Sequence, residues 1–478
     1  MFVIPKPKEA KKEQGDFVFG KELFITLPRN IYEKISKSHL EALLSNYTAG
    51  ETTTHFVMSE KLSGVAVVDT EMRDENLSCT TNYDYELHIT QSFAKFLFGD
   101  EKGFIHAFVT FLQLIRFEGF GENFYLRVPC YTIKDSPDMA FRSVHLCVFR
   151  DTSLDFLKKA ISLCGIMKCS HVVLEFWGTY KFECYPDLSW KEAYTKEQIK
   201  PIVEYANAIG VEIIPMLNHL GHASQGRICS GKHSALDTNL RLAPYFEEDG
   251  WSWCTSNPET LKLLEECRKE LIDLCGKGEY FHIGCDEAYT FATCEKCRTR
   301  DKDEIMLEHI TNISNDLKKY GRRAIMWGDM FLDKEKFLPP YECNGRGENK
   351  ILNDIPKDVI IADWQYNVKT DFLSSQFFAD KGFDVVCCPW NSRDNVSAAI
   401  NTVKNNSLHG VIGTTWHTLQ FMQWLIPYIA DVMWGNGGKL SDQEYTLHCS
   451  YIVRRCVPSN GDYEKSGFID REVPFISF

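Results

Sequence analysis

The chain has 478 residues, of which 44% are apolar and 25% charged, and this composition excludes a disordered or fibrous protein. Its formal net charge is −13, from 53 Lys and Arg residues against 66 Asp and Glu residues. A molecule of that sign repels a phosphate backbone on average, so we expect no nucleic-acid partner.

No stretch reaches the ~18 uninterrupted apolar residues that a membrane span requires. The closest, 104–115, is short and contains His106 and Gln113, so we expect no membrane partner. The first residues lack the charged start and long apolar run of a secretory signal, which predicts a cytoplasmic location. The 18 cysteines are then expected to stay reduced, as small core residues. The oligomeric state stays open, a homodimer included.

Residues 1–135 mix strand-like and helix-like segments, which predicts a separate, smaller α+β domain. We place its boundary in the polar stretch Ile133–Pro137, where proline stops regular structure, and expect a second domain over 138–478. The strand-like segments are Gly64–Val68 and Tyr85–Ile89, and the helix-like segments are Ile31–Leu44 and Gly103–Arg116.

From about Phe141 onward, short β-rich runs alternate with helical stretches, a pattern typical of parallel strands joined by crossover helices. Eight such runs predict an α/β fold of the closed (β/α)8, or TIM barrel, type. The runs begin near Ser143, His171, Val211, Tyr280, Arg323, Asp358, Asp384 and Gly410.

Two of the crossover helices carry start signals. Thr195 and Gln198 have the spacing of a capping box, and Asn257-Pro258 places a capping residue before proline at the first helical position. The second helix is expected to bury an apolar stripe. That stripe comprises Leu261, Leu264, Cys267, Leu271 and Leu274.

The connection between the third and fourth runs, about 218–256, is long and rich in Gly, His and Trp. Loops that follow the strands of a barrel line its active site. This connection is therefore expected to be a functional loop.

The fourth run ends in His282-Ile-Gly-Cys-Asp286-Glu287, which places two adjacent carboxylates at the carboxyl end of a buried strand. Two carboxylates in different surroundings can have separated pKa values, so that one stays an anion while the other keeps a proton to donate. A simple helix-start Asp-Glu pair is the alternative for such a dipeptide. The residues at the neighbouring strand ends, described next, favour the catalytic interpretation.

Tryptophan ends three of the other runs: Trp327, within Trp-Gly-Asp329, Trp364 and Trp416. Indole rings form an apolar wall for the C–H faces of a sugar, while nearby polar groups bind its hydroxyls. One such tryptophan is usually a core residue, so the inference of a glycan site depends on all three converging.

These features resemble the family-20 glycoside hydrolases, the β-N-acetylhexosaminidases, including the hexosaminidase D-like branch. The family's His-x-Gly-Gly-Asp-Glu signature appears at His282 to Glu287 with Cys285 at the second glycine, and Gly221-His222 resembles the segment after the third strand. Further similar segments are Tyr85–Thr90, Thr110–Ile115, Ile133–Pro137, Phe141–Leu146 and Pro215–Asn218.

The resemblance implies an exo-acting, retaining hydrolase of terminal β-linked GlcNAc or GalNAc, with no cofactor. The substrate's own 2-acetamido oxygen would attack the anomeric carbon and give an oxazolinium intermediate, an exception to the two-carboxylate rule. Glu287, held neutral beside an anionic Asp286, would protonate the leaving oxygen and later activate water, while Asp286 would orient the acetamide N–H. His222, with Glu175 as its partner, would tune Glu287.

The residues expected to bind substrate come from several strands. By the same resemblance, Arg142 matches the family's arginine at the start of the first strand and would donate to sugar hydroxyls. The set expected to line the site is Arg142, Glu175, Trp327, Asp329, Trp364, Trp390, Asn391 and Trp416.

Two departures from the family pattern leave the preference between GlcNAc and GalNAc open. The usual Asp and Tyr of the seventh strand are not evident, so the residue that holds the acetamide carbonyl is unassigned. Thr418 stands where a glutamate usually follows the eighth-strand tryptophan.

Cys294 and Cys297 could supply two thiolates to a structural zinc ion, with Cys285 or a histidine. A second Cys-x-x-Cys is missing, so no metal is assigned, and the mechanism requires none.

Two alternative functions remain: a two-carboxylate glycosidase with Asp329 or Glu175 as nucleophile, and a non-catalytic glycan-binding barrel. Walker loops and Gly-x-Ser-x-Gly elbows are absent from the sequence, which argues against phosphoryl transfer and serine hydrolysis.

Overall fold

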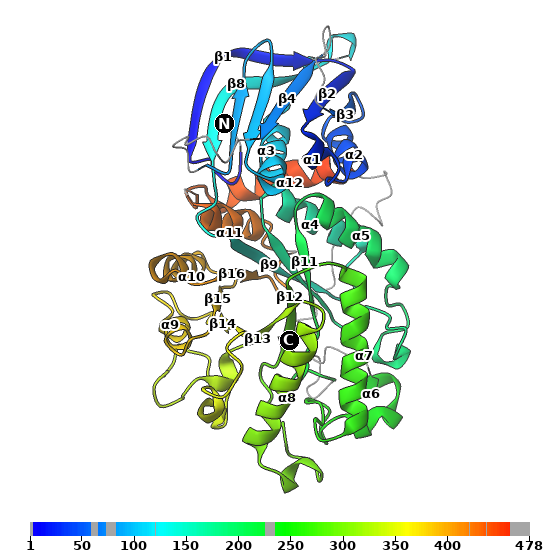
Figure 1. The fold of residues 1–478 in the computed structure, drawn as a ribbon, viewed down its shortest axis with the longest axis vertical. Helices are drawn as coiled ribbons and strands as arrows, with labels where there is room; N and C mark the ends of the chain where they lie inside the picture. Colours follow the sequence, from blue (N-terminus) through cyan, green and yellow to red (C-terminus); the bar gives the residue numbers. More distant parts are fainter. Residues whose placement is uncertain are drawn as a thin grey trace.

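The computed structural model describes residues 3–458, apart from 59–65, 73–82, 120, 225–234, 420 and 436. An N-terminal α+β region is stacked on one end of a closed barrel of eight parallel strands (Figure 1). The predicted fold class, a TIM barrel preceded by a smaller α+β domain, is confirmed.

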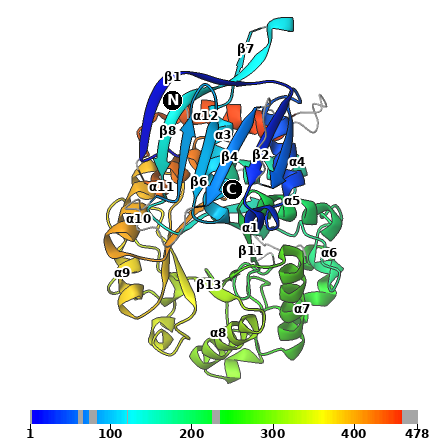
Figure 2. The same ribbon diagram turned by 45° about the horizontal axis from the view of Figure 1, so that its top comes forward.

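The N-terminal region is built on a mixed sheet with the strand order β1-β8-β5-β6-β4-β2-β3, and β7 pairs with β8. Figure 2 shows β7 projecting beyond the rest of the sheet. The strands are β1 (Glu9–Phe19), β2 (Glu22–Leu27), β3 (Thr53–Met58), β4 (Val67–Met72), β5 (Tyr85–Ile89), β6 (Ala94–Phe98), β7 (Arg116–Glu118) and β8 (Tyr125–Asp135).

Three helices accompany this sheet: α1 (Arg29–Tyr32), α2 (Lys37–Tyr47) and α3 (Glu101–Leu114). Helix α3 is buried from Gly103 onward, and the Asp100 carboxylate caps it by accepting a hydrogen bond of 2.8 Å from the Gly103 N–H. The single helical stretch predicted over 31–44 is two helices. Residues 64 and 65 of the predicted strand over 64–68 lie outside the described part of the chain.

The barrel closes because each strand pairs in parallel with the next and the last with the first. These strands are buried along almost their whole length, as expected for a parallel sheet covered on both faces. They are β9 (Phe141–Val148), β10 (His171–Phe176), β11 (Glu212–Met216), β12 (Tyr280–Gly284), β13 (Arg323–Trp327), β14 (Ile360–Trp364), β15 (Val385–Cys388) and β16 (Gly410–Thr414).

The helices of the barrel region are α4 (Leu154–Ile166), α5 (Lys196–Ala208), α6 (Ala235–Thr238), α7 (Pro258–Cys275), α8 (Lys302–Lys318), α9 (Leu373–Asp380), α10 (Arg393–Asn406), α11 (Leu425–Trp434) and α12 (Asp442–Cys456). Both predicted caps are present. The Thr195 N–H donates to Gln198 Oε1 at 2.9 Å, and Asn257 Oδ1 accepts from the Glu259 N–H at 3.2 Å.

The buried stripe of α7 differs from the prediction at one position. Leu261 is 39% exposed, whereas Leu263 is buried. Position 260 faces the core and 263, 264, 267 and 271 follow it at helical spacing, so 261 falls one residue outside the stripe.

The two regions meet around a buried charge network at the amino end of the barrel. Asp135, at the end of β8, accepts a hydrogen bond from Lys168 Nζ at 3.0 Å, and neither side chain is exposed. The Tyr85 hydroxyl and the Trp434 indole N–H also donate to this carboxylate, at 2.7 and 2.8 Å. Residues from both regions therefore share one buried anion.

Helix α12 lies between the sheet and the barrel (Figure 1). Its Arg455 guanidinium donates to the main-chain carbonyls of Tyr47 and Ile115 in the N-terminal region. Helix α12 also packs on α4 of the barrel and on α2. It therefore ties the two regions together.

Every cysteine in the described residues is a free thiol, and most are buried. Over the same part of the chain, none of the helices combines the length and the apolar character that crossing a bilayer demands.

Candidate active site

The turn after β12 has an unusual backbone. Gly284, Cys285 and Glu287 have φ values of +67°, +74° and +45°, in the left-handed region. A Cβ on Gly284 would lie 2.1 Å from Asn218 Oδ1, so glycine is required there. Cys285 adopts the left-handed conformation with a side chain, at the position where the family signature has glycine. Non-glycine residues in this region concentrate at functional sites.

With this turn, both predicted carboxylates contact the same histidine. His222 Nε2 lies 3.1 Å from Glu287 Oε2 and 3.3 Å from Asp286 Oδ2. The loop that carries the histidine approaches closely because residue 221 is glycine: a Cβ there would lie 2.2 Å from the Asp286 carbonyl oxygen. The structure thus places His222, Asp286 and Glu287 together.

Residues of the connection over 218–256 hold this cluster in place. The Asn218 amide donates to Asp286 Oδ1 at 3.3 Å, and the Trp251 indole N–H donates to the Glu287 carbonyl oxygen at 2.6 Å. The Trp251 ring lies 4.3 Å from the His222 ring, centroid to centroid. Tyr289 donates its hydroxyl hydrogen to Glu287 Oε1. The described part of the predicted functional loop therefore contacts the His222, Asp286 and Glu287 cluster.

The ionisation of Glu287 differs from the prediction. Burial raises the pKa of Glu287, but hydrogen bonds from His222 and Tyr289 favour its anion and bring the pKa below the usual value. The acid of this cluster with a raised pKa is Asp329, at about 7, because it is fully buried and lies close to the charge of Asp286.

Asp329 supports the site from below the turn. Its carboxylate accepts hydrogen bonds from the Glu287 N–H at 3.1 Å, the Asn344 amide at 3.0 Å and the Trp364 indole N–H at 3.2 Å. It is 1% exposed. Asp329 therefore fixes both the turn after β12 and one indole, and it is buried.

The predicted indoles gather at the carboxyl end of the barrel, but at different depths. Trp327 is fully buried, with its ring centroid 6.3 Å from that of Trp416, so it belongs to the core that fills the barrel and not to the predicted indole wall. Trp364 and Trp416 are half-buried and pack on the core that fills the barrel. These two half-buried rings form the wall.

Tyr366 is a site residue that the sequence reasoning missed. The Trp416 indole N–H donates to its hydroxyl oxygen at 2.8 Å, and its ring lies 5.1 Å from that of Trp364 and 5.2 Å from that of Trp390. Burial, with the charges of Cys388 and Asp286 adding to it, raises the pKa of Tyr366 well above its usual value. Its position two residues after a strand-end tryptophan was the available signal.

Glu175 lies at the end of β10, 2% exposed. The structure pairs it with a different histidine from the predicted one: His145 Nε2 of β9 lies 3.0 Å from Glu175 Oε2, and the Trp177 indole N–H donates to the same oxygen at 3.2 Å. The His145 ring in turn lies 4.8 Å from that of Trp416. Glu175 is therefore linked to the Trp416 indole through His145.

Arg142 does not line the site, and this prediction is wrong. Its side chain lies at the amino end of β9 and donates to the carbonyls of Lys168, Met139 and Ala140 at 3.0, 2.6 and 3.0 Å. Its Nε and Nη1 atoms are bonded to backbone carbonyls at the opposite end of the barrel, away from Asp286 and Glu287. The exposed arginine beyond the carboxyl end of β9 is Arg150, whose guanidinium lies 4.4 Å from the Trp190 ring.

The seventh strand places Trp390 at the rim, with its ring 5.8 Å from that of His417. Asn391 follows directly and is half-buried. Thr418, at the position of the missing glutamate, is buried and donates to the Thr415 carbonyl oxygen at 2.6 Å. It closes the turn after β16.

Two family models match this chain. The glycosyl hydrolase family 20 catalytic domain matches residues 169–409, and domain 2 of the same family matches residues 1–136. Among curated proteins, a beta-hexosaminidase of Emericella nidulans is 21% identical over 323 residues, which are 59% of this chain and 48% of that protein. Hexosaminidase D of Bos taurus is 24% identical over 238 residues, 47% of this chain and 62% of that protein. The chain thus spans about half the length of such relatives.

Solved structures show the same fold. A family-20 exo beta-N-acetylglucosaminidase from Vibrio harveyi, in complex with N-acetylglucosamine, superimposes with a TM-score of 0.70 at 16% identity. The match covers 95% of this chain and 76% of the Vibrio harveyi chain. The N-acetyl-beta-hexosaminidase of Streptomyces plicatus has a TM-score of 0.68 at 16% identity and covers 95% of both chains.

Proposed function

The chain belongs to glycosyl hydrolase family 20, and from that premise we propose that it is an exo-acting, retaining β-N-acetylhexosaminidase that removes terminal β-linked GlcNAc or GalNAc. The observation that carries this proposal is the contact of Asp286 and Glu287 with one histidine at the carboxyl end of β12, where Asp329 bonds both the Glu287 N–H and the Trp364 indole. No cofactor enters the mechanism.

In the proposed reaction the substrate's acetamide oxygen attacks the anomeric carbon as the glycosidic bond breaks. Glu287 gives a proton to the leaving oxygen and later takes one from water, while Asp286 accepts a hydrogen bond from the acetamide N–H. In the free protein the Glu287 anion is favoured. A sugar that covers this carboxyl excludes water from it and raises its pKa, which favours the protonated acid that the first step needs.

We assign the acetamide carbonyl to Tyr366. Its hydroxyl oxygen accepts a hydrogen bond from the Trp416 indole N–H, the Thr414 side chain contacts the same hydroxyl, and the raised pKa keeps the hydroxyl hydrogen in place as a donor. The charge of Asp286 contributes to the raised pKa of the same hydroxyl. Tyr366 and Asp286 would then hold the two ends of one acetamide group, with its methyl toward the indoles.

The bonding of the other carboxylates argues against a two-carboxylate mechanism. A nucleophile must present a carboxylate oxygen to the anomeric carbon. Asp329 accepts three hydrogen bonds and is 1% exposed, and Glu175 is 2% exposed and bonded to His145 and Trp177. A purely glycan-binding role is disfavoured because the Asp286, Glu287 and His222 cluster is intact.

The test is hydrolysis of nitrophenyl β-GlcNAc and β-GalNAc by the purified chain. Glu287→Gln should lower kcat by about 10²- to 10⁴-fold, the range of general acid–base catalysis, and Asp286→Asn should also remove most turnover. The surface variant Glu265→Gln, paired with Lys269 and half-exposed, should behave like wild type.

Two inhibitors separate the mechanisms. A thiazoline mimic of the intermediate should bind far more tightly than substrate, because a site shaped for the transition state favours such analogues. Covalent trapping of Asp329 or Glu175 by a 2-fluoro sugar would instead support the two-carboxylate mechanism. Sugar binding with no turnover of either aryl glycoside would support the non-catalytic role.

We further propose a cytoplasmic location. The free thiols of the described residues support it, since reduced cysteines persist where thiol reductants are abundant. Detection of the protein in a secreted fraction would contradict this.

A further inference from the structure

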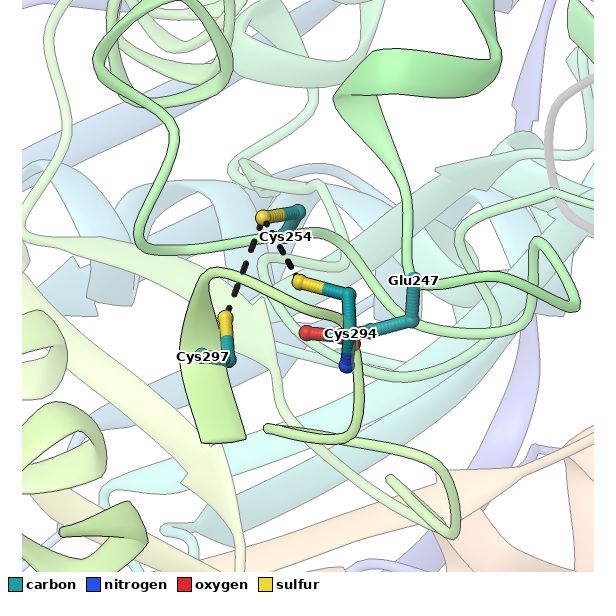
Figure 3. Close-up of side chains that lie close together, drawn as sticks. All are labelled: Glu247, Cys254, Cys294 and Cys297. Atoms are coloured by element: carbon teal, nitrogen blue, oxygen red, sulfur yellow. Dashed lines mark hydrogen bonds between the residues drawn. The ribbon is translucent and has the colours of Figure 1, made fainter. Parts of the chain in front are cut away.

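Three thiols and one carboxylate converge beside the proposed active site, from two connections of the barrel. Cys254 lies between β11 and α7, and Cys294 and Cys297 lie between β12 and α8. Glu247 comes from the same connection as Cys254. Figure 3 shows the three sulfurs and the carboxylate directed toward one another.

The spacing of the sulfurs fits a shared metal ion and not a disulfide. Cys254 Sγ lies 3.5 Å from Cys294 Sγ and 3.8 Å from Cys297 Sγ. Bonded sulfurs are about 2.05 Å apart, whereas two thiolates bound at about 2.3 Å to one tetrahedral zinc ion are about 3.8 Å apart. One ligand atom from each of the four residues lies within 4.8 Å of all the others.

Glu247 supplies a second, independent indication of a bound cation. The side chain is 1% exposed, and its Oε2 accepts hydrogen bonds from the main-chain N–H groups of Cys294 and Thr293, at 2.6 and 3.1 Å. Its other oxygen, Oε1, is buried and has no hydrogen-bond partner. A buried carboxylate oxygen without a donor is costly unless a cation binds it.

We propose that Glu247, Cys254, Cys294 and Cys297 form a structural zinc site. Three thiolates and a carboxylate are ligand types that zinc takes in tetrahedral geometry. Because four protein ligands fill the coordination shell, the site has no open position for water or substrate, and it takes no part in the hydrolysis.

The zinc ion would fasten together the two connections that carry the catalytic cluster. The first carries His222 and Trp251, and the second begins with Asp286 and Glu287. Other contacts between these connections include the hydrogen bonds from Trp251 to Glu287 and from Thr290 to Asp249, and the ion pairs of His222. The four ligands are therefore positioning residues for the proposed reaction, although the metal site itself does not depend on the proposed activity.

The third thiol is not the one that the sequence suggested. Cys285 points its sulfur at the Ile283 carbonyl oxygen, 3.5 Å away. Cys254 takes its place from 40 residues before Cys294, a separation that no short spacing motif reveals.

The test is the metal content of the full chain, purified without chelator and measured by mass spectrometry. We expect one zinc per chain. Replacement by Co²⁺ should give the charge-transfer absorption of a tetrahedral site with three thiolates. The variants Cys254→Ser and Cys297→Ser should each weaken zinc binding at least about tenfold, and Glu247→Gln, which keeps the shape of the side chain, should do so as well.

Cys184→Ser is the matched control. Cys184 Sγ lies 3.7 Å from Cys267 Sγ, a similar spacing outside the four-ligand cluster, so this variant should keep its zinc. Absence of zinc from the wild-type chain after incubation with Zn²⁺, full zinc content in Cys254→Ser, or a Cys254–Cys294 disulfide in the native protein would each overturn the site. Unchanged zinc affinity in Glu247→Gln would overturn the fourth ligand. Since zinc content is read without substrate, an inactive chain that holds zinc would contradict only the proposed function.

Discussion

At the scale of single residues, Tyr366 is the assignment most open to test. If its hydroxyl holds the acetamide oxygen, Tyr366→Phe keeps the ring and removes one donor, and kcat/KM for nitrophenyl β-GlcNAc should fall about 10²- to 10³-fold. Tyr341→Phe removes a half-buried hydroxyl that donates to the Asp371 carbonyl oxygen, and it should leave the rate unchanged. Equal rates for Tyr366→Phe and wild type would remove Tyr366 from the mechanism.

Asp329 gives a prediction for stability against pH. Its pKa is raised from 3.8 to about 7 by burial and the Asp286 charge, so the folded chain keeps a proton that the unfolded chain releases. The free energy of unfolding therefore falls as the pH rises from about 4 to about 7, by up to about 4 kcal/mol from this group. Asp329→Asn cannot ionise, so its stability relative to wild type should rise over that pH range in urea titrations. A constant difference would contradict the raised pKa.

At the scale of elements, the turn after β12, which carries the proposed catalytic carboxylates, depends on the close approach of two loops. Gly284→Ala would place a Cβ 2.1 Å from Asn218 Oδ1 at a φ of +67°, and both effects disfavour the native turn. We expect a loss of stability of about 1–3 kcal/mol in thermal unfolding and a lower kcat, because Asn218 also positions Asp286. Gly276→Ala is the control: its φ is similar, +68°, but no atom lies within 4 Å of the added Cβ.

The elements also show which features could be predicted from the sequence. The barrel strands follow from short apolar runs, and two helix starts follow from Thr195-Gln198 and Asn257-Pro258, because these signals are local. Tyr366 and Cys254 were missed because each joins its partners through contacts between loops far apart in sequence. Arg142 was assigned to the site by resemblance although it begins its strand, and its guanidinium stays at that amino end because backbone carbonyls bind it there.

At the scale of the whole molecule, the buried pair of Asp135 and Lys168 joins the two regions. Asp135→Ala leaves the Lys168 ammonium buried without its anion, and we expect a loss of about 3–5 kcal/mol in the free energy of unfolding. Glu33→Ala breaks the exposed pair with Arg29 and should cost less than about 1 kcal/mol in the same assay. Similar values for the two variants would mean that water reaches the Asp135 pair.

The contact of Arg455 with Tyr47 spans 408 positions of the chain, and it bears on biosynthesis. On the ribosome the N-terminal sheet emerges first, yet the helix that covers α2 emerges only after all eight barrel strands. At roughly 5–20 residues per second, the nascent sheet would wait about 20 seconds or more with that surface uncovered. We expect chaperones that bind apolar surface to associate with the nascent chain mainly during this interval.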